Sequence, residues 1–139
     1  MPTVLYAEDD PEHRDMMRMT LKDTNIILIE AVDGHEALQK IQAQHPDLIV
    51  LDLFMPRLDG FSVMEAVRAN PNTRHIPIIV LSAWPTGDNR KRTKKAGASE
   101  FVAKPYQPSE LIKLIENTLA DQSNLVPLKP KSDTAPFRT

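Results

Sequence analysis

Short apolar runs alternate with amphipathic segments five times along this chain. The apolar runs predict strands at Thr3–Ala7, Ile26–Glu30, Leu48–Asp52, Ile76–Ser82 and Glu100–Ala103. The segments between and after them repeat apolar residues at helical spacing and predict helices near residues 11–23, 34–44, 59–70, 87–96 and 108–121. This alternation, with short connections, predicts an α/β domain with a mainly parallel sheet, right-handed crossovers and helices on both faces.

Residues typical of helix ends support these boundaries. Asp10 followed by Pro11 is the combination expected at a helix N-terminus, and Gly97 stands where the end of a helix needs a left-handed backbone. The alternating pattern stops near residue 124, and the following residues combine several prolines with a lack of periodicity. We therefore expect one folded domain over residues 1–123 and a flexible, proline-containing tail over residues 124–139.

Charge is distributed unevenly, although the net charge of the 139-residue chain is only −2. Residues 1–86 contain 13 acids and 7 Lys or Arg (net −6), whereas residues 87–139 contain 6 acids and 10 Lys or Arg (net +4). This division predicts an anionic site in the first part and a basic face in the second. The sequence has no cysteine, no apolar stretch long enough to span a bilayer and no secretory pattern at its N-terminus. We therefore expect a cytoplasmic protein without disulfides and without a membrane partner.

Polar side chains follow four of the five predicted strands, at the point where each strand ends. In a doubly wound five-stranded parallel sheet of order 2-1-3-4-5, these four strands are neighbours, and their carboxyl ends meet at the edge where ligands bind. The converging residues are Glu8, Asp9 and Asp10 after the first strand, Asp52 at the end of the third, Ser82 at the end of the fourth and Lys104 after the fifth.

Several carboxylates at one sheet edge need a counter-charge. Two like charges 4 Å apart repel by about 4 kcal/mol at an effective dielectric constant near 20. Lys104 offsets one negative charge and leaves room for a divalent cation. Oxygen ligands without His or Cys favour Mg²⁺ or Mn²⁺. A carboxylate, a metal ion, Lys104 and the Ser82 hydroxyl together would make a receptor for a phosphoryl group.

Four motifs occur in order along the chain: Val4-Leu5-Tyr6-Ala7-Glu8-Asp9-Asp10, Leu51-Asp52-Leu53-Phe54-Met55-Pro56-Arg57-Leu58-Asp59-Gly60, Leu81-Ser82-Ala83 and Gly97-Ala98-Ser99-Glu100-Phe101-Val102-Ala103-Lys104-Pro105. In these motifs the chain resembles the response-regulator receiver domains of two-component signalling, and the resemblance runs from about Thr3 to Asp121. It implies a flavodoxin/CheY-like fold.

The resemblance also implies a role for each matching position. Asp52 corresponds to the residue that accepts a phosphoryl group from a phosphohistidine. The expected Mg²⁺ ligands are Glu8, Asp9, Asp52 and the backbone carbonyl of Phe54. Mn²⁺ is expected to be able to replace Mg²⁺ at this site. The remaining expected positions are the switch hydroxyl Ser82, the phosphate-binding Lys104, the rotamer-changing aromatic Phe101 and a cis peptide bond between Lys104 and Pro105.

Two large apolar residues occupy positions that flank the phosphorylation site in this family. Phe54 stands two residues after Asp52, and Trp84 stands two residues after Ser82. We expect both to restrict the access of water and to prolong the life of an acyl phosphate. The histidines show no metal-binding spacing, and we expect surface positions for His13, His35, His45 and His75.

The function implied is a phosphorylation-dependent switch rather than an enzyme acting on a separate substrate. A histidine kinase or histidine phosphotransfer protein would supply the phosphoryl group. The output would pass through protein contacts of the face formed by residues 87–96, 100–103 and 108–121. The basic cluster Arg90-Lys91-Arg92-Thr93-Lys94-Lys95 favours an acidic downstream target. A pI near 6.1 argues against direct nucleic-acid binding. Both a monomer and a phosphorylation-dependent dimer are compatible with the sequence.

Three other interpretations compete with this one. The chain could be a receiver module excised from a hybrid kinase or another multidomain regulator. A hydrolase with an aspartyl-phosphate intermediate generally carries a second acid two residues after the nucleophile, where this chain has Phe54. A flavin carrier of the same topology would need a phosphate-binding loop after the first strand, where Glu8, Asp9 and Asp10 would repel phosphate.

Overall fold

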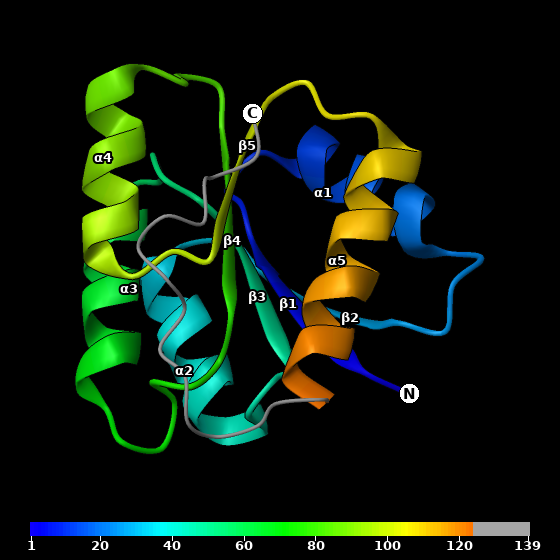
Figure 1. Cartoon of the computed structure of the whole chain (residues 1–139), viewed down its shortest axis with the longest axis horizontal. Helices are drawn as coiled ribbons and strands as arrows, with labels where there is room; N and C mark the ends of the chain where they lie inside the picture. Colours follow the sequence, from blue (N-terminus) through cyan, green and yellow to red (C-terminus); the bar gives the residue numbers. More distant parts are fainter. Residues whose placement is uncertain (124–139) are drawn as a thin grey trace.

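Five parallel strands alternate with five helices in the computed structural model, which describes residues 1–123 (Figure 1). The strands are β1 (Thr3–Ala7), β2 (Ile27–Ala31), β3 (Leu48–Asp52), β4 (Ile78–Ser82) and β5 (Glu100–Ala103). The helices are α1 (Pro11–Leu21), α2 (Gly34–Gln44), α3 (Gly60–Ala69), α4 (Gly87–Ala96) and α5 (Pro108–Ser123). The sheet order β2-β1-β3-β4-β5 confirms the predicted doubly wound topology. The expected tail over 124–139 lies outside the described residues.

The helices cover the two faces of the sheet in unequal numbers: α1 and α5 lie on one face, and α2, α3 and α4 lie on the other (Figure 1). Successive side chains of a strand point to opposite faces, so each strand contributes to two cores. In β1, Leu5 packs in the core under α2 and α3, whereas Val4 and Tyr6 pack in the core under α1 and α5. All residues of β3 and β4 are buried, as expected for central strands covered on both faces.

The predicted bounds of two strands were wrong. The fourth strand begins at Ile78 instead of Ile76, because Ile76 closes a turn by donating its N–H to the Thr73 carbonyl, and Pro77 has no N–H to donate to a sheet. The second strand is shifted by one residue, since it begins with Ile27 opposite Thr3 and ends with Ala31 opposite Ala7. The predicted helices over 34–44 and 87–96 are confirmed at both ends, and the other three differ from the observed ones by one or two residues at one or both ends, which is the usual uncertainty of helix termini.

Aspartates begin three of the helices. Asp10, Asp33 and Asp59 each precede a helix and accept a hydrogen bond from a backbone N–H of its first turn, at 2.8–2.9 Å. Gly97 ends α4 with φ = 106°, the left-handed conformation that the sequence predicts. These local signals fix where each helix starts relative to the preceding strand.

Gly60, the first residue of α3, packs directly against the end of β3. A Cβ atom added to Gly60 would lie 2.6 Å from the Asp52 carbonyl oxygen and 2.8 Å from the Leu53 Cα. Because backbone atoms cannot move aside cheaply, Gly60→Ala is expected to lower the free energy of unfolding by about 2 kcal/mol. Gly87, at the start of α4, has nothing within 4 Å of an added Cβ. Gly87→Ala is therefore the matched control, with a gain of up to about 1 kcal/mol. Urea unfolding measures both effects, and equal stabilities of the two variants would contradict this packing argument.

Candidate functional site

Four polar side chains meet at the carboxyl edge of the sheet because the strands carrying them run in the same direction. Asp52 ends β3 and Ser82 ends β4, while Glu8 follows β1 and Lys104 follows β5. Backbone hydrogen bonds continue past the strand ends: Glu8 donates its N–H to Ala31 at 3.0 Å, and Lys104 donates its N–H to Ser82 at 2.9 Å. The convergence predicted from the sequence is therefore present, and it rests on strand pairing.

Three carboxylates form the centre of this site. One oxygen from each of Glu8, Asp9 and Asp52 lies within 4.8 Å of the other two. Glu8 is 1% exposed and Asp52 is 8% exposed, whereas Asp9 is open to solvent. Burial of like charges is unfavourable unless a cation compensates them. An all-oxygen cluster that is open on one side fits Mg²⁺ with part of its water shell retained.

Lys104 supplies the positive charge on the buried side of the cluster. Its Nζ lies 2.5 Å from Glu8 Oε1 and 3.8 Å from Asp52 Oδ2. The Tyr6 hydroxyl donates a further hydrogen bond of 3.2 Å to Glu8. The ammonium is thus hydrogen bonded to Glu8 and lies next to Asp52.

The two buried carboxylates differ in their affinity for a proton. Burial and the neighbouring Glu8 raise the pKa of Asp52 to about 7, against the smaller opposing effect of Lys104. Burial also raises the pKa of Glu8, but hydrogen bonds with Asp52, Lys104 and His13 outweigh it and bring the pKa down to about 2. Without a bound cation, Glu8 therefore carries the negative charge and Asp52 retains a proton up to near-neutral pH.

His13 belongs to this site, although its side chain is also 43% exposed, as expected for a surface position. Its Nδ1 lies 2.8 Å from Glu8 Oε1 and 3.1 Å from Lys104 Nζ. The reason is the immediate start of α1 at Pro11, which brings the first helical turn over the end of β1. The next residue, Arg14, donates hydrogen bonds to the backbone carbonyls of Glu8 and Asp9 at 2.8 and 3.0 Å. The spacing of His13 from the predicted helix cap was the sequence signal that could have identified it.

The predicted switch residues are both fully buried. The Ser82 Oγ accepts a hydrogen bond of 3.0 Å from the Trp84 backbone N–H, so the hydroxyl is held toward the β4–α4 loop. The Phe101 ring lies in the core, with the Arg90 guanidinium carbon 4.6 Å from the ring centroid. The Lys104-Pro105 peptide bond is cis, as expected from the resemblance.

The two predicted gatekeepers are large apolar side chains with unusual exposure. Phe54 is 46% exposed and Trp84 is 63% exposed. Each follows by two residues a strand-end residue of the site, so both lie on the loops around the carboxylates. The backbone of Phe54 also forms a hydrogen bond with the Asp52 carboxylate, which lowers the pKa of Asp52 slightly.

Fold and site together define a doubly wound α/β protein with a carboxylate–lysine cluster at its topological switch point. The family model of the response regulator receiver domain matches residues 4–116. The chain belongs to this family, and so to the proteins of two-component signalling. Members of the family are phosphoacceptor switches that bind Mg²⁺ at an acidic cluster and interact with histidine kinases or phosphotransfer proteins.

Individual relatives agree with this assignment. The transcriptional regulatory protein PrrA of Mycobacterium tuberculosis is 38% identical over 85% of this chain and 50% of its own length. The chain thus spans about half of this curated relative. The chemotaxis protein CheY4 of Vibrio cholerae is 32% identical with a TM-score of 0.79, covering 84% of this chain and 98% of that one. The receiver domain of the sensor histidine kinase PA1611 of Pseudomonas aeruginosa, solved with a magnesium ion in its active-site cleft, is 28% identical with a TM-score of 0.80 over 86% and 98% of the chains.

Membrane-spanning helices need about 20 predominantly apolar residues, which the helices of residues 1–123 do not provide. None of these helices combines the length and the hydropathy needed to cross a bilayer.

Proposed function

We propose that this receiver domain is a switch that accepts a phosphoryl group on Asp52 from a histidine kinase or a histidine phosphotransfer protein. The observation that carries the proposal is the position of the Asp52 carboxylate. It lies at the end of a buried strand, with Glu8 and Asp9 on one side and the Lys104 ammonium 3.8 Å away. Asp52 can therefore attack phosphorus from a site that already contains a counter-charge for the transferring group.

In the transfer step, an oxygen of ionised Asp52 forms a bond to phosphorus while the phosphorus–nitrogen bond of the donor breaks. The donor imidazole leaves with the electron pair of that bond. Lys104 is placed to exchange part of its interaction with Glu8 for a phosphoryl oxygen. Glu8, Asp9, Asp52 and the Phe54 carbonyl would hold Mg²⁺. When bound, Mg²⁺ supplies positive charge beside the phosphoryl oxygens, and Mn²⁺ has the ligand preferences to replace it.

The switch itself requires a rearrangement of the β4–α4 loop. Ser82 must release the Trp84 N–H before its hydroxyl can donate to a phosphoryl oxygen. Phe101, packed beneath Arg90, would then change rotamer as the loop and α4 repack. Phosphorylation would thereby shift a population between two states, and the α4–β5–α5 face would pass the change to a downstream protein.

The same proposal covers the extent of the domain, its location and its oligomeric state. Residues 1–123 form the receiver unit, in the cytoplasm, as a monomer or as a dimer that depends on phosphorylation. The domain acts as a phosphoacceptor that catalyses its own phosphorylation and dephosphorylation. The same switch would work within a longer hybrid kinase or multidomain regulator.

Incubation of the purified protein with acetyl phosphate and Mg²⁺ tests this function. The expected result is an increase in intact mass by one phosphoryl group, mapped to Asp52 after proteolysis. EDTA is expected to prevent it. An unchanged mass, or a label on another side chain, would refute the proposal.

Substitution of the gatekeepers is expected to shorten the lifetime of the acyl phosphate. In Phe54→Asn and Trp84→Glu, a polar side chain replaces an apolar one at the site and can orient an attacking water. Autodephosphorylation should then be faster by on the order of tenfold. Ile27→Thr is the control, because Ile27 is 45% exposed on β2 and remote from the carboxylates. Decay rates of the two gatekeeper variants equal to that of Ile27→Thr would show that water access is not limiting.

A further inference from the structure

We propose that the groove between α3 and α4 binds an acidic segment of a partner protein, and that the Phe54, Phe61 and Arg92 side chains couple this groove to the phosphorylation site. The inference rests on the proposed phosphorylation of Asp52. It adds a second contact surface, on the α3 side of α4, with a stated partner chemistry.

The groove has a volume of about 530 Å³ and is mainly basic. Its lining includes Arg68 from α3 and Arg92 and Lys95 from α4, against the single carboxylate of Glu65. The Arg68 guanidinium is fixed in place, because it donates hydrogen bonds to three backbone carbonyls around the end of α4 and the start of β4. The two α4 cations are exposed, and within residues 1–123 neither forms an ion pair with a carboxylate.

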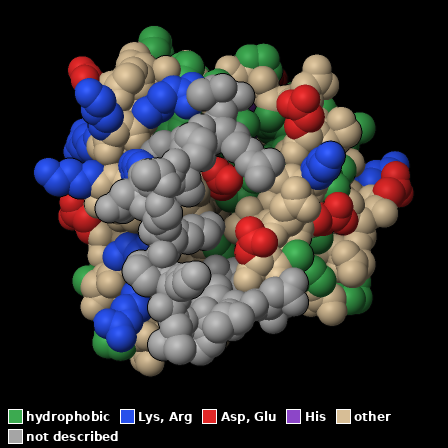
Figure 2. Space-filling view, in the orientation of Figure 1, with side chains coloured by type: hydrophobic (Ala, Val, Ile, Leu, Met, Phe, Trp, Pro, Cys, Tyr) green, Lys and Arg blue, Asp and Glu red, His purple; other side chains and the backbone are tan. Residues whose placement is uncertain are grey.

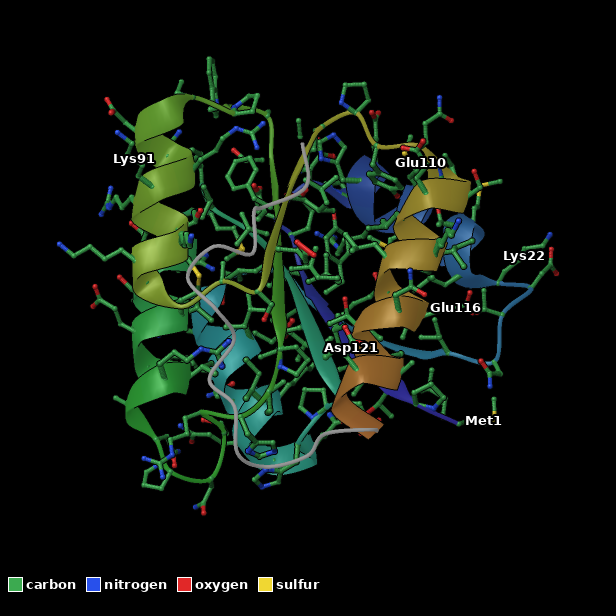
Figure 3. All side chains as sticks on the ribbon, in the orientation of Figure 1. Met1, Lys22, Lys91, Glu110, Glu116 and Asp121 are labelled. Atoms are coloured by element: carbon green, nitrogen blue, oxygen red, sulfur yellow. The ribbon has the colours of Figure 1, made fainter. Side chains whose placement is uncertain are left out.

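The basic residues of α4 fall on more than one side of the helix. Arg92 and Lys95 are three positions apart and line the groove. Lys91 lies one turn before Lys95, at the outer edge of the molecule and outside the lining of the groove (Figure 3). Lys and Arg side chains gather along the edge of the molecule that α4 forms (Figure 2). Because the same helix carries cations inside and outside the groove lining, a binding site in the groove can be separated experimentally from a general effect of charge.

A series of ring contacts joins this groove to the phosphorylation site. The Arg92 guanidinium carbon lies 3.7 Å from the centroid of the Phe61 ring, which is 4% exposed. The Phe61 ring meets the Phe54 ring edge to face, with 6.5 Å between the centroids. The Phe54 backbone is hydrogen bonded to the Asp52 carboxylate. A change in the loop that carries Phe54 therefore alters the packing of Phe61, and Arg92 must adjust with it.

An acidic protein segment fits this groove better than a nucleic acid does. The two exposed α4 cations can pair with carboxylates, while Ala69 and Ala96 in the lining of the groove offer an apolar contact to a neighbouring side chain of the segment. A polyphosphate backbone would also meet the field of the acidic part of the molecule, since residues 1–86 carry a net charge of −6.

Binding of a fluorescein-labelled peptide of glutamate and leucine to the whole chain tests the inference by fluorescence anisotropy. The measurements are made in Mg²⁺ alone and in Mg²⁺ with beryllofluoride, which imitates the phosphoryl group. Lys95→Gln is expected to weaken binding by about three- to fivefold, as the loss of one exposed charge pair predicts. Lys91→Gln removes the same charge outside the groove lining and should leave the affinity within about twofold of wild type. Arg92→Lys retains the charge but loses the planar stack on Phe61, so the effect of beryllofluoride on the affinity should disappear.

The possible outcomes separate this inference from the proposed function. Equal weakening by Lys95→Gln and Lys91→Gln, or undetectable peptide binding, would overturn the groove site. So would tighter binding of a short DNA duplex than of the peptide. Trp84 fluorescence is followed in parallel on unlabelled samples. A Trp84 signal that does not respond to beryllofluoride would refute the switch, whereas a response without the difference between Lys95 and Lys91 would refute the groove alone.

Discussion

The Asp52→Asn variant is expected to lose phosphoryl uptake completely and, without divalent cations, to be more stable than the wild type at pH 8. An amide is not a nucleophile toward phosphorus, so no acyl phosphate can form. The stability gain has a separate origin. Burial and Glu8 raise the pKa of Asp52 from 3.8 to about 7 in the folded protein. The native state therefore holds a proton that the unfolded chain releases, and the free energy of unfolding falls as the pH rises from about 4 to 7.

Neutral asparagine removes this unfavourable ionisation. At pH 8 we expect the variant to gain about 2 kcal/mol in free energy of unfolding, and at pH 4 the difference should nearly vanish because Asp52 is then protonated in the native state. Urea unfolding at both pH values in EDTA measures the gain. Asp23→Asn, which changes an exposed aspartate in the turn after α1, is the control. This variant should retain phosphoryl uptake and should not gain stability at pH 8. Retained phosphorylation, or a loss of stability at pH 8, would contradict the position assigned to Asp52.

The apparent affinity for Mg²⁺ is expected to rise by about tenfold between pH 6 and pH 8. A metal-binding carboxylate must be ionised, and burial with the neighbouring Glu8 raises the pKa of Asp52 to about 7. Below that pH the cation competes with a proton, and above it the competition ends. Titration of Trp84 fluorescence with MgCl₂ at several pH values measures the effect, since Trp84 lies on a loop beside the site. In a weakly buffered sample near pH 7, Mg²⁺ should also release protons.

His13→Asn provides the control for this experiment. His13 is hydrogen bonded to Glu8 and near Lys104, and it is an ionisable neighbour of the cluster that is not among the expected metal ligands. The variant is expected to retain the pH dependence if Asp52 is responsible. A Mg²⁺ affinity that is independent of pH in the wild type, or a dependence that disappears in His13→Asn, would show that Asp52 does not hold the competing proton.

Most of the fold could be predicted because its signals are local. Aspartate caps, Gly97 and the buried strands around Asp52 and Ser82 each depend on a few neighbouring residues, and the parallel topology then follows from the alternation of strands and helices. The meeting of Glu8, Asp52, Ser82 and Lys104 at one edge is a consequence of that topology. Their individual roles remain predictions.

The features that the sequence did not predict depend on tertiary contacts, or on apolar runs in which no residue marks the start of strand pairing. The second strand lies in a continuous apolar run, so nothing in Ile26 or Ile27 indicates which residue starts the pairing. The contacts of His13 could not be predicted without knowing that the first turn of α1 lies over the end of β1. The stack of Arg92 on Phe61 joins residues 31 positions apart in sequence, on helices whose packing no local pattern specifies. The basic cluster is a charge pattern in the sequence, but which of its cations line the groove with α3 is visible only in the folded protein.

The Arg68 side chain has a consequence for the local unfolding of the domain. Its guanidinium is bonded to the carbonyls of Gly97, Arg74 and Ile76, and thus fastens α3 to the end of α4 and to the turn before β4. Fraying of any one of these segments exposes the same buried cation, so amide hydrogens across all three should exchange with solvent at a common rate. The half of the domain that receives the phosphoryl signal would then open as one cooperative block.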